Sequence, residues 1–257
     1  MADTVSFGYR KISPVEKKRL VREQFDPLAR TYDLADAVLS AGLDSLWRRR
    51  AIHLLGLRAG ARVLDVCGGT AELALLALRK SGPGGCAVVY DFNRAMMEQG
   101  RSRGCKRQSG GCLLFVQGDA EELSFAGNAF DAVTVGFGLR NLANPEQGLA
   151  EMYRVLRPGG ALMILEFSLP VDSMLRHLYH FYSFKIMPRI ARLICGTAEP
   201  FRYLAESIRV FPSPEEIAGL MIQSGFSKIR FMRFANGLAV TYFGCKPPLT
   251  EWEEEKE

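Results

Sequence analysis

The sequence predicts an α/β fold on a seven-stranded, doubly wound and mostly parallel sheet that ends in an antiparallel hairpin. Through the middle of the chain, short apolar runs alternate with helical stretches, which is typical of consecutive β-α units. Near the C-terminus, two runs rich in apolar residues flank Asn236-Gly237, a dipeptide typical of hairpin turns. Together these patterns favour a Rossmann-like sheet closed by antiparallel strands.

The most informative stretch joins a strand to a helix. An apolar run at 63–66 leads to Gly68 and Gly69, and an apolar helix follows at 73–78. A glycine pair after a strand is often a plain connecting turn. However, Asp91 closes the next strand about 20 residues later, the spacing expected of a nucleotide site. The turn and the acid together therefore predict a ligand site at the carboxyl ends of the strands.

The other helices and strands are predicted from the periodicity of apolar residues, from turn-forming residues and from helix-capping residues. Strands are expected at 63–66, 87–91, 113–116, 130–135, 161–167, 228–234 and 238–245. Residues 1–60 are expected to be helices with breaks, and helices are expected at 29–39, 43–57, 73–78, 94–103, 145–156, 171–194 and from Ser213. A surface loop is expected at 104–111, a sharp turn at 157–160 and a solvated acidic tail from Glu251.

Residues 171–194 interrupt the β-α alternation and are dense in aromatic and basic side chains. One interpretation is a helix that packs its apolar face on the core. The other is an apolar lid or a surface that contacts a membrane. The sequence leaves both open.

Composition limits the classes of partner. The 257 residues, 48% of them hydrophobic, suit one large domain, and the formal charge of +5 forms no obvious stripe for nucleic acid. Six cysteines without a Cys-x-x-Cys pair, and no secretory leader, predict a reduced cytoplasmic protein. The three histidines form no metal-ligand pattern, so no metal is expected. No apolar run reaches the ~18 residues of a membrane span.

The order of elements resembles the class I S-adenosylmethionine-dependent methyltransferases, and three strings narrow the resemblance to the UbiE-type quinone C-methyltransferases of menaquinone and ubiquinone synthesis. The strings are Phe-Gly-Leu-Arg-Asn at 137–141, Arg-Val-Leu-Arg-Pro-Gly-Gly at 154–160 followed by Glu-Phe-Ser at 166–168, and Tyr-Leu-Ala-Glu-Ser-Ile-Arg at 203–209. The similarity extends from about residue 7 to residue 246.

The chain departs from the family pattern at several positions near the expected ligand. Ala71 and Glu72 stand where the family has Gly and Asp. The family's Met, Asn and His in an N-terminal signature are replaced by Ala35, Asp36 and Asp44. Gly136 stands at a usual serine, and Thr241 stands where histidine is common.

The resemblance implies S-adenosylmethionine as the methyl donor. It places Gly68, Gly69 and Thr70 beside the amino-acid portion, Asp91 at the ribose hydroxyls and Asp119 with Ala120 at the adenine. Tyr32 and Asp33 are expected to close the pocket. The cofactor-binding residues it implies are Tyr32, Gly68, Gly69, Thr70, Asp91, Asp119, Ala120 and Gly136.

The expected reaction is C-methylation of a reduced isoprenoid quinone precursor, with demethylmenaquinol preferred over a polyprenyl benzoquinol. Arg140 is expected to stabilise the developing phenolate, and Asn141 to orient it or a bridging water. Alternatively, Arg140 only holds its loop. Another acceptor and a non-catalytic scaffold of a quinone-synthesis complex remain alternatives. A homodimer and peripheral membrane contact are left open.

The resemblance also suggests a division of the single domain, 1–257. It gives a helical cap at 1–60, a cofactor-binding core at 61–168, a helical lid at 169–212, a closing helix and hairpin at 213–247 and the acidic tail at 248–257.

Overall fold

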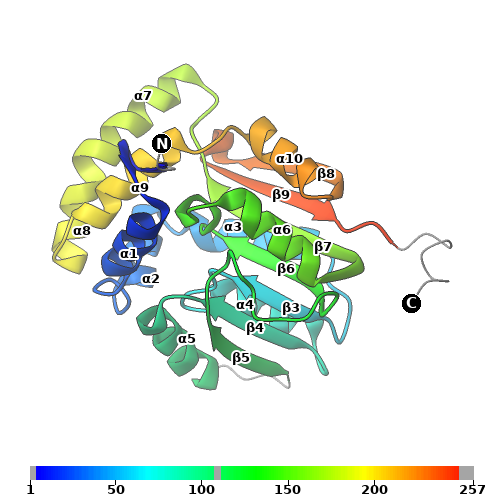
Figure 1. Cartoon of the computed structure of the whole chain (residues 1–257). Coiled ribbons are helices and arrows are strands. Elements are labelled where there is room, and N and C mark those ends of the chain that lie inside the picture. The colour runs from blue at the N-terminus through cyan, green and yellow to red at the C-terminus, as the bar shows by residue number, and fades with distance from the viewer. Residues whose placement is uncertain (1–3, 107–110, 249–257) are drawn as a thin grey trace.

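The computed structural model of the protein describes residues 4–106 and 111–248. One seven-stranded sheet, in the order β5-β4-β3-β6-β7-β9-β8, forms the centre of the molecule (Figure 1). Its strands are β3 (Arg62–Val66), β4 (Cys86–Asp91), β5 (Cys112–Gln117), β6 (Phe130–Gly136), β7 (Leu156–Phe167), β8 (Ser227–Phe234) and β9 (Ala239–Cys245). β9 is antiparallel to both of its neighbours, and the other pairs are parallel. The predicted sheet with its antiparallel C-terminal hairpin is confirmed.

The strand order creates a switch point beside β3. The chain passes from β3 outward to β4 and β5, and then returns to the other side of β3 as β6. At such a point the crossover helices diverge to opposite faces, which opens a crevice at the carboxyl ends of the strands. The sequence stretch with the glycine pair leaves β3 at this crevice.

Helices cover both faces of the sheet. The described helices are α1 (Pro14–Phe25), α2 (Tyr32–Leu39), α3 (Leu43–Leu55), α4 (Glu72–Ser81), α5 (Arg94–Lys106), α6 (Pro145–Val155), α7 (Ser173–Phe181), α8 (Met187–Cys195), α9 (Glu199–Val210) and α10 (Pro214–Gln223). Short helical turns lie at η1 (Leu139–Asn141), η2 (Tyr182–Ile186) and η3 (Ala235–Gly237). In Figure 1, α1, α2, α8 and α9 gather at one side of the sheet.

Alternation along β3 divides the core into two layers. Leu64 and Val66 point to the layer that contains Leu149 of α6 and Met221 of α10. Val63 points the opposite way, toward the layer that α3 and α4 supply. Because helices bury both faces of the sheet, the buried part of β3 is a run of apolar residues interrupted by one acid.

The N-terminal region differs from the expected run of helices. Residues 5–12 form a small antiparallel hairpin, β1 (Val5–Phe7) with β2 (Arg10–Ile12). Phe7 stacks on Tyr203 of α9 with ring centroids 4.3 Å apart. Strands of three residues carry too little periodicity to be recognised, and this hairpin depends on a contact with a distant helix. The helix expected at 29–39 begins at Tyr32, because residues 26–31 form turns.

The segment expected as one helix at 171–194 consists of α7, a π-helical turn at η2 and α8. Pro188 lies in the first turn of α8 and has no N–H to donate to a carbonyl in the preceding turn, so the helical hydrogen-bond ladder widens there. Within the described residues, no helix combines the length and the hydropathy needed to cross a bilayer.

Other boundaries shift by a few residues. α5 continues through residues 104–106, which were expected in a loop, and the turn expected at 157–160 is an irregular start of β7, where Gly159 has a φ of +77°. The rest of the expected loop, at 107–110, and the tail from Glu251 lie outside the described residues. α9 was not predicted as a helix, although the family string at 203–209 lies within it. The division into cap, core, lid and closing unit stays a prediction.

Candidate active site

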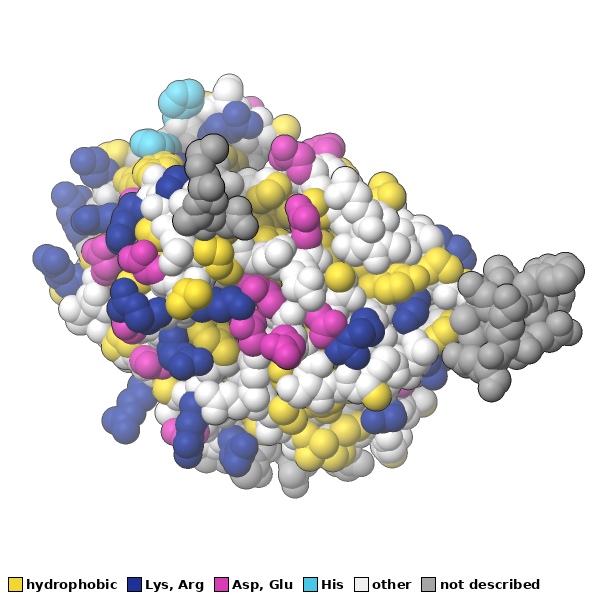
Figure 2. Space-filling model, viewed as in Figure 1, with side chains coloured by type: hydrophobic (Ala, Val, Ile, Leu, Met, Phe, Trp, Pro, Cys, Tyr) yellow, Lys and Arg dark blue, Asp and Glu magenta, His cyan; other side chains and the backbone are white. Residues whose placement is uncertain are grey.

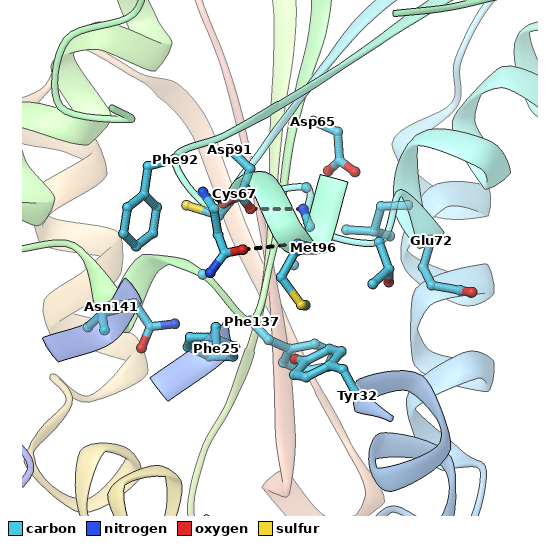
Figure 3. Close-up of a pocket in the computed structure, with 18 of the residues that line it drawn as sticks. Phe25, Tyr32, Asp65, Cys67, Glu72, Asp91, Phe92, Met96, Phe137 and Asn141 are labelled. Carbon is cyan, nitrogen blue, oxygen red and sulfur yellow. Dashed lines mark hydrogen bonds between the residues drawn. The ribbon is translucent and has the colours of Figure 1, made fainter. Parts of the chain in front are cut away.

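The main cavity lies at the switch point, where β3, β4 and β6 end (Figure 3). It encloses about 680 Å³, including its open mouth. α1, α2 and α3 of the N-terminal region supply part of the wall, and the strand ends supply the rest. The lining residues are Val21, Phe25, Tyr32, Arg48, Asp65, Cys67, Gly68, Gly69, Thr70, Glu72, Leu73, Asp91, Phe92, Asn93, Met96, Gly136, Phe137, Gly138 and Asn141.

The glycine turn forms the floor of the cavity. A Cβ on Gly68 would lie 2.8 Å from the carbonyl oxygen of Asp65 and 2.9 Å from Cγ1 of Val89, so a larger residue does not fit. Gly69 has a φ of +46°. Ala71 follows with a φ of +67°, which costs about 1 kcal/mol for a residue with a Cβ. The family's glycine at this position would avoid that cost.

Asp91 ends β4 at the edge of this turn. Its carboxylate accepts the backbone N–H of Gly69 at 2.9 Å and that of Asn93 at 2.7 Å (Figure 3). Burial raises the pKa of Asp91 to about 6, against the backbone hydrogen bonds that favour its ionised form. A carboxylate held at a cavity wall in this way can accept hydroxyl donors from a ligand.

Asp65 also lines the cavity, and both of its carboxylate oxygens are engaged inside the protein. One oxygen accepts the backbone N–H of Ala74 at 3.0 Å, and the other accepts the hydroxyl of Thr134 at 2.7 Å. Burial raises the pKa of Asp65 to about 7. These contacts are those of an acid that stabilises the turn. Asp131 has a similar role at the other end of the sheet, where it accepts the backbone N–H of Arg62 at 2.6 Å.

An ion-pair bridge ties the cap to the glycine turn. The hydroxyl of Thr70 donates to Asp33 of α2 at 2.7 Å. Arg103 of α5 pairs with Asp33 and with Glu72. The longer acid that replaces the family's aspartate at 72 is thus one partner of this arginine. Tyr32, next to Asp33, lines the same cavity, and burial raises the pKa of its hydroxyl above the ordinary value.

A second, smaller cavity of about 360 Å³ adjoins the first and shares Cys67, Phe92 and Asn141 with it. Asp119 and Ala120 lie in its wall. The carboxylate of Asp119 accepts the ammonium of Lys18, from α1, at 2.6 Å. The structure therefore brings the expected adenine-side residues to a recess that adjoins the main cavity.

Gly136 ends β6, Asn141 lies in the turn η1 that follows, and both line the main cavity. A Cβ on Gly136 would lie 2.5 Å from Cδ1 of Leu73, so the family's serine would require Leu73 to move. The side-chain oxygen of Asn141 accepts the hydroxyl of Tyr203 at 3.1 Å. In Figure 3 the Asn141 side chain lies near Phe92 and Phe137 at the cavity.

Arg140 does not take the position expected for a group that faces the acceptor. Among the described residues that line the two cavities, Arg140 is absent. Its guanidinium is buried, pairs with Glu166 at 2.8 Å and donates to the carbonyl of Phe137. The backbone N–H of Arg140 donates to the same Glu166 at 3.2 Å. These contacts favour the alternative interpretation, in which Arg140 holds the loop after β6, because its charge is already neutralised inside the protein.

Several lining residues were not predicted from the sequence. Phe25 of α1, Phe92 and Met96 after β4, and Arg48 of α3 all reach the main cavity. In the sequence, Arg48 is the first of three consecutive arginines, at 48–50. Helical periodicity does not distinguish which of the three arginines faces the cavity, so the sequence alone could not predict Arg48 as a lining residue.

Comparison with known proteins agrees with the fold and the cavity described above. The model of the ubiE/COQ5 methyltransferase family matches residues 4–246. The chain belongs to this family. Its cavity is accordingly that of an S-adenosylmethionine-dependent methyltransferase, and the predicted family, cofactor and enzyme class are confirmed.

Similar proteins include two from Pseudomonas with the same name, "Ubiquinone/menaquinone biosynthesis C-methyltransferase UbiE". The protein of Pseudomonas putida strain GB-1 is 43% identical over 244 residues, and that of Pseudomonas paraeruginosa strain PA7 is 41% identical over 244 residues. Both alignments cover 95% of each chain.

Solved structures of remote methyltransferases share the fold. A methyltransferase from Thermotoga maritima has a TM-score of 0.61 at 19% identity, over 87% of this chain and 98% of that chain. One from Aquifex aeolicus has a TM-score of 0.56 at 15% identity, over 92% of this chain and 100% of that chain.

The contacts of Arg140 generate a stability prediction. The Arg140→Ala variant should lower the free energy of unfolding by about 3–5 kcal/mol, because it leaves the buried carboxylate of Glu166 without its partner. Urea denaturation followed by circular dichroism measures this. The control is Arg94→Ala, which removes an exposed pair with Glu98 and should change stability by less than about 1 kcal/mol. Unchanged stability together with lost turnover would return Arg140 to the acceptor site.

Proposed function

We propose that this chain transfers a methyl group from S-adenosylmethionine to a ring carbon of a reduced isoprenoid quinone precursor. Demethylmenaquinol is the preferred acceptor, and a polyprenyl benzoquinol is the second. The observation that carries the proposal is the cavity at the switch point. It is supported by 43% identity, over nearly the full length of the chain, to a protein named for ubiquinone and menaquinone biosynthesis.

The residues at the cavity fit the methyl donor. At Gly68 a Cβ would clash with Asp65 and Val89, so glycine lets the backbone of the turn lie at the cavity, and Asp91 presents a carboxylate to hydroxyl donors. We assign Gly68, Gly69 and Thr70 to the amino-acid portion and Asp91 to the ribose. Asp119 and Ala120, in the adjoining recess, are assigned to the adenine. The bound donor supplies an activated methyl group on a sulfonium sulfur.

The protein's own task is to align the acceptor and keep water away. The ring carbon gains the methyl group and loses its proton when the ring regains aromaticity, and that proton leaves through the open mouth of the cavity to bulk solvent. Tyr32 and Phe25 close the cavity from the cap, and Asn141, held by Tyr203, presents its amide to the ring. Arg140 holds the loop that follows β6 through Phe137 and Glu166, and in this way it positions the adjacent Asn141.

An apolar groove offers a path for the isoprenoid tail. It lies between α7 and the turn that joins β8 to β9, and encloses about 500 Å³. Its walls include Leu175, Leu178, Tyr179 and Tyr182. Tyr182 also packs in the same apolar cluster as Tyr32, and so the groove and the main cavity meet a common set of side chains.

We also propose that α7, η2 and α8 contact a membrane surface from a cytoplasmic location. This α7–α8 face, Ser173–Cys195, contains no acid. Its exposed apolar side chains are Met174, Leu175, Leu178, Phe181, Ile186 and Leu193, and its exposed bases are Arg176, Lys185, Arg189 and Arg192. Figure 2 shows Lys and Arg side chains along the edge of the molecule where α8 lies. Bases beside exposed apolar groups are complementary to an anionic bilayer, from which a lipid acceptor would enter the groove.

Methyl transfer tests the proposed reaction. With labelled S-adenosylmethionine and a reduced short-chain demethylnaphthoquinol, the wild-type protein should place one labelled methyl on a ring carbon. The Gly68→Val variant is the control and should be inactive, because its side chain would clash with the carbonyl of Asp65 and with Val89 and would displace the glycine turn. Turnover on another acceptor alone would favour a different methyltransferase. Donor binding without turnover on any acceptor would favour the scaffold.

The pKa of Asp91 generates a pH prediction. Affinity for S-adenosylmethionine should fall as the pH drops through about 6, because the protonated carboxyl is a poorer acceptor for the ribose hydroxyls, and should level off above that pH. Calorimetric titration from about pH 5 to about pH 8, which spans that pKa, measures it. In Asp91→Asn the part of this dependence centred near pH 6 should disappear, whereas any part due to Asp65, whose pKa is about 7, should stay the same in both proteins. An identical pH profile for both proteins would exclude Asp91 from the ribose site.

Vesicle binding tests the α7–α8 face. The double variant Leu178→Glu with Phe181→Glu should lose at least about tenfold in affinity for phosphatidylglycerol vesicles, since it places charge on the apolar side chains that would enter the bilayer. Co-sedimentation measures it. Ile222→Glu, on the exposed side of α10, is the control and should bind as the wild type does. Gel filtration that shows a dimer, with no vesicle binding, would make this face an interface between copies.

A further inference from the structure

The main cavity carries a positive charge on a residue that the sequence did not single out. Among the described residues that line it, Arg48 of α3 is the one lysine or arginine. Its side chain is 8% exposed. In the adjoining recess, Lys18 is engaged by Asp119 and Glu121 at 2.6 and 2.7 Å. A ligand in the main cavity therefore meets the guanidinium of Arg48 as its cationic partner.

Two carboxylates hold this guanidinium in place. Asp36 of α2 accepts one of its nitrogens at 3.1 Å, and Asp44, one turn earlier on α3, accepts the other. Asp44 is itself fixed by the hydroxyl of Ser40 at 2.7 Å. The guanidinium lies over the ring of Phe137, 5.0 Å from its centroid. An arginine constrained on two sides and on one face has lost its rotamer freedom before any ligand binds.

Both carboxylates are departures from the family pattern, which has asparagine and histidine at 36 and 44. They come from different helices, α2 and α3, and converge on one side chain in the structure. A carboxylate forms a shorter and stronger hydrogen bond with a guanidinium than a neutral amide or imidazole does. The two replacements therefore act together, and their common effect is to fix Arg48.

Arg48 and Arg140 flank the same aromatic pair, but only Arg48 lines the main cavity. Phe137 stacks on Phe167 with centroids 4.1 Å apart. Arg48 contacts Phe137, and Arg140 lies 5.5 Å from the centroid of Phe167. The aromatic pair thus has an arginine on each member. Arg140 is paired with Glu166 in the core, whereas Arg48 is part of the cavity wall.

We propose that Arg48 is an acceptor-binding residue that donates a hydrogen bond to a ring oxygen of the quinol, and that Asp36 and Asp44 are positioning residues for it. The proposal rests on the proposed function, because it takes the acceptor to be an oxygenated aromatic ring. A guanidinium carries more N–H groups than its two carboxylate partners use, so donors remain for the ligand. The carboxylates offset its charge. Its contribution is accordingly a directed hydrogen bond, with selectivity for a ring that bears oxygen at that point.

Competition between two nearly isosteric inhibitors tests this role. 1-Naphthol offers a hydroxyl where 1-methylnaphthalene offers a methyl group, so the ratio of their inhibition constants against the quinol reports the hydrogen bond. In the wild type the ratio should favour the naphthol by about tenfold, the scale for a hydrogen bond to a charged group. In Arg48→Gln it should fall to about one. In Arg154→Gln, which loses an arginine–carboxylate pair remote from the cavity, it should keep the wild-type value.

Binding of S-adenosylmethionine, measured by calorimetry, confirms that each variant is folded. Arg48→Lys covers the case in which Arg48→Gln fails to fold, because a lysine keeps the charge but cannot satisfy two carboxylates and a ring oxygen in the same geometry. Its ratio should fall at least about threefold. If the wild type methylates the quinol and the folded variant keeps the wild-type ratio of inhibition constants, the role of Arg48 is overturned and the proposed function is not. Absence of quinol methylation by the wild type would instead overturn the proposed function.

Discussion

The buried carboxylate of Asp65 fixes the turn on which the rest of the site depends. Ala71 precedes α4 and has no side-chain oxygen with which to cap the helix. Asp65 reaches across from β3 and accepts the backbone N–H of Ala74 in the first helical turn, while its other oxygen accepts Thr134 from β6. One acid thereby joins two strands and a helix start. The partial positive charge at the helix N-terminus favours the ionised form, while burial opposes it.

From that turn the site is built outward through charged contacts between separate elements. Thr70 donates to Asp33, and Arg103 joins Asp33 to Glu72, so that the cap closes over the turn. On the far side, Arg140 and Glu166 fix the loop that follows β6. Each pair is partly or fully buried, where losing one partner is costly, and each restricts how the cavity wall can move.

The departures from the family pattern acquire physical meaning in this arrangement. Glu72 meets Arg103, and Asp36 and Asp44 meet Arg48. Gly136 leaves room for Leu73. Ala71 is different, because it adds a Cβ at a left-handed backbone position and nothing in the structure offsets that cost. Most of the changes are therefore compensated by a partner at a distance in the sequence.

The sequence by itself determined the sheet, the hairpin and the glycine turn. Period, turn residues and strand-end acids are local properties, and the family strings at 137–141 and 154–160 add the chemistry. These are also the parts that place Gly68, Gly69, Thr70, Asp91 and Gly136 at one cavity.

The tertiary structure decided which charged side chains face the cavity. Arg48 turns inward and Arg140 turns to Glu166, although both are arginines next to apolar residues in the sequence. The β1–β2 hairpin exists because Phe7 meets Tyr203, and Arg103 meets Asp33 across 70 positions of chain. Side-chain direction is set by which partners the folded backbone brings within hydrogen-bonding distance, and a local pattern contains no record of those partners.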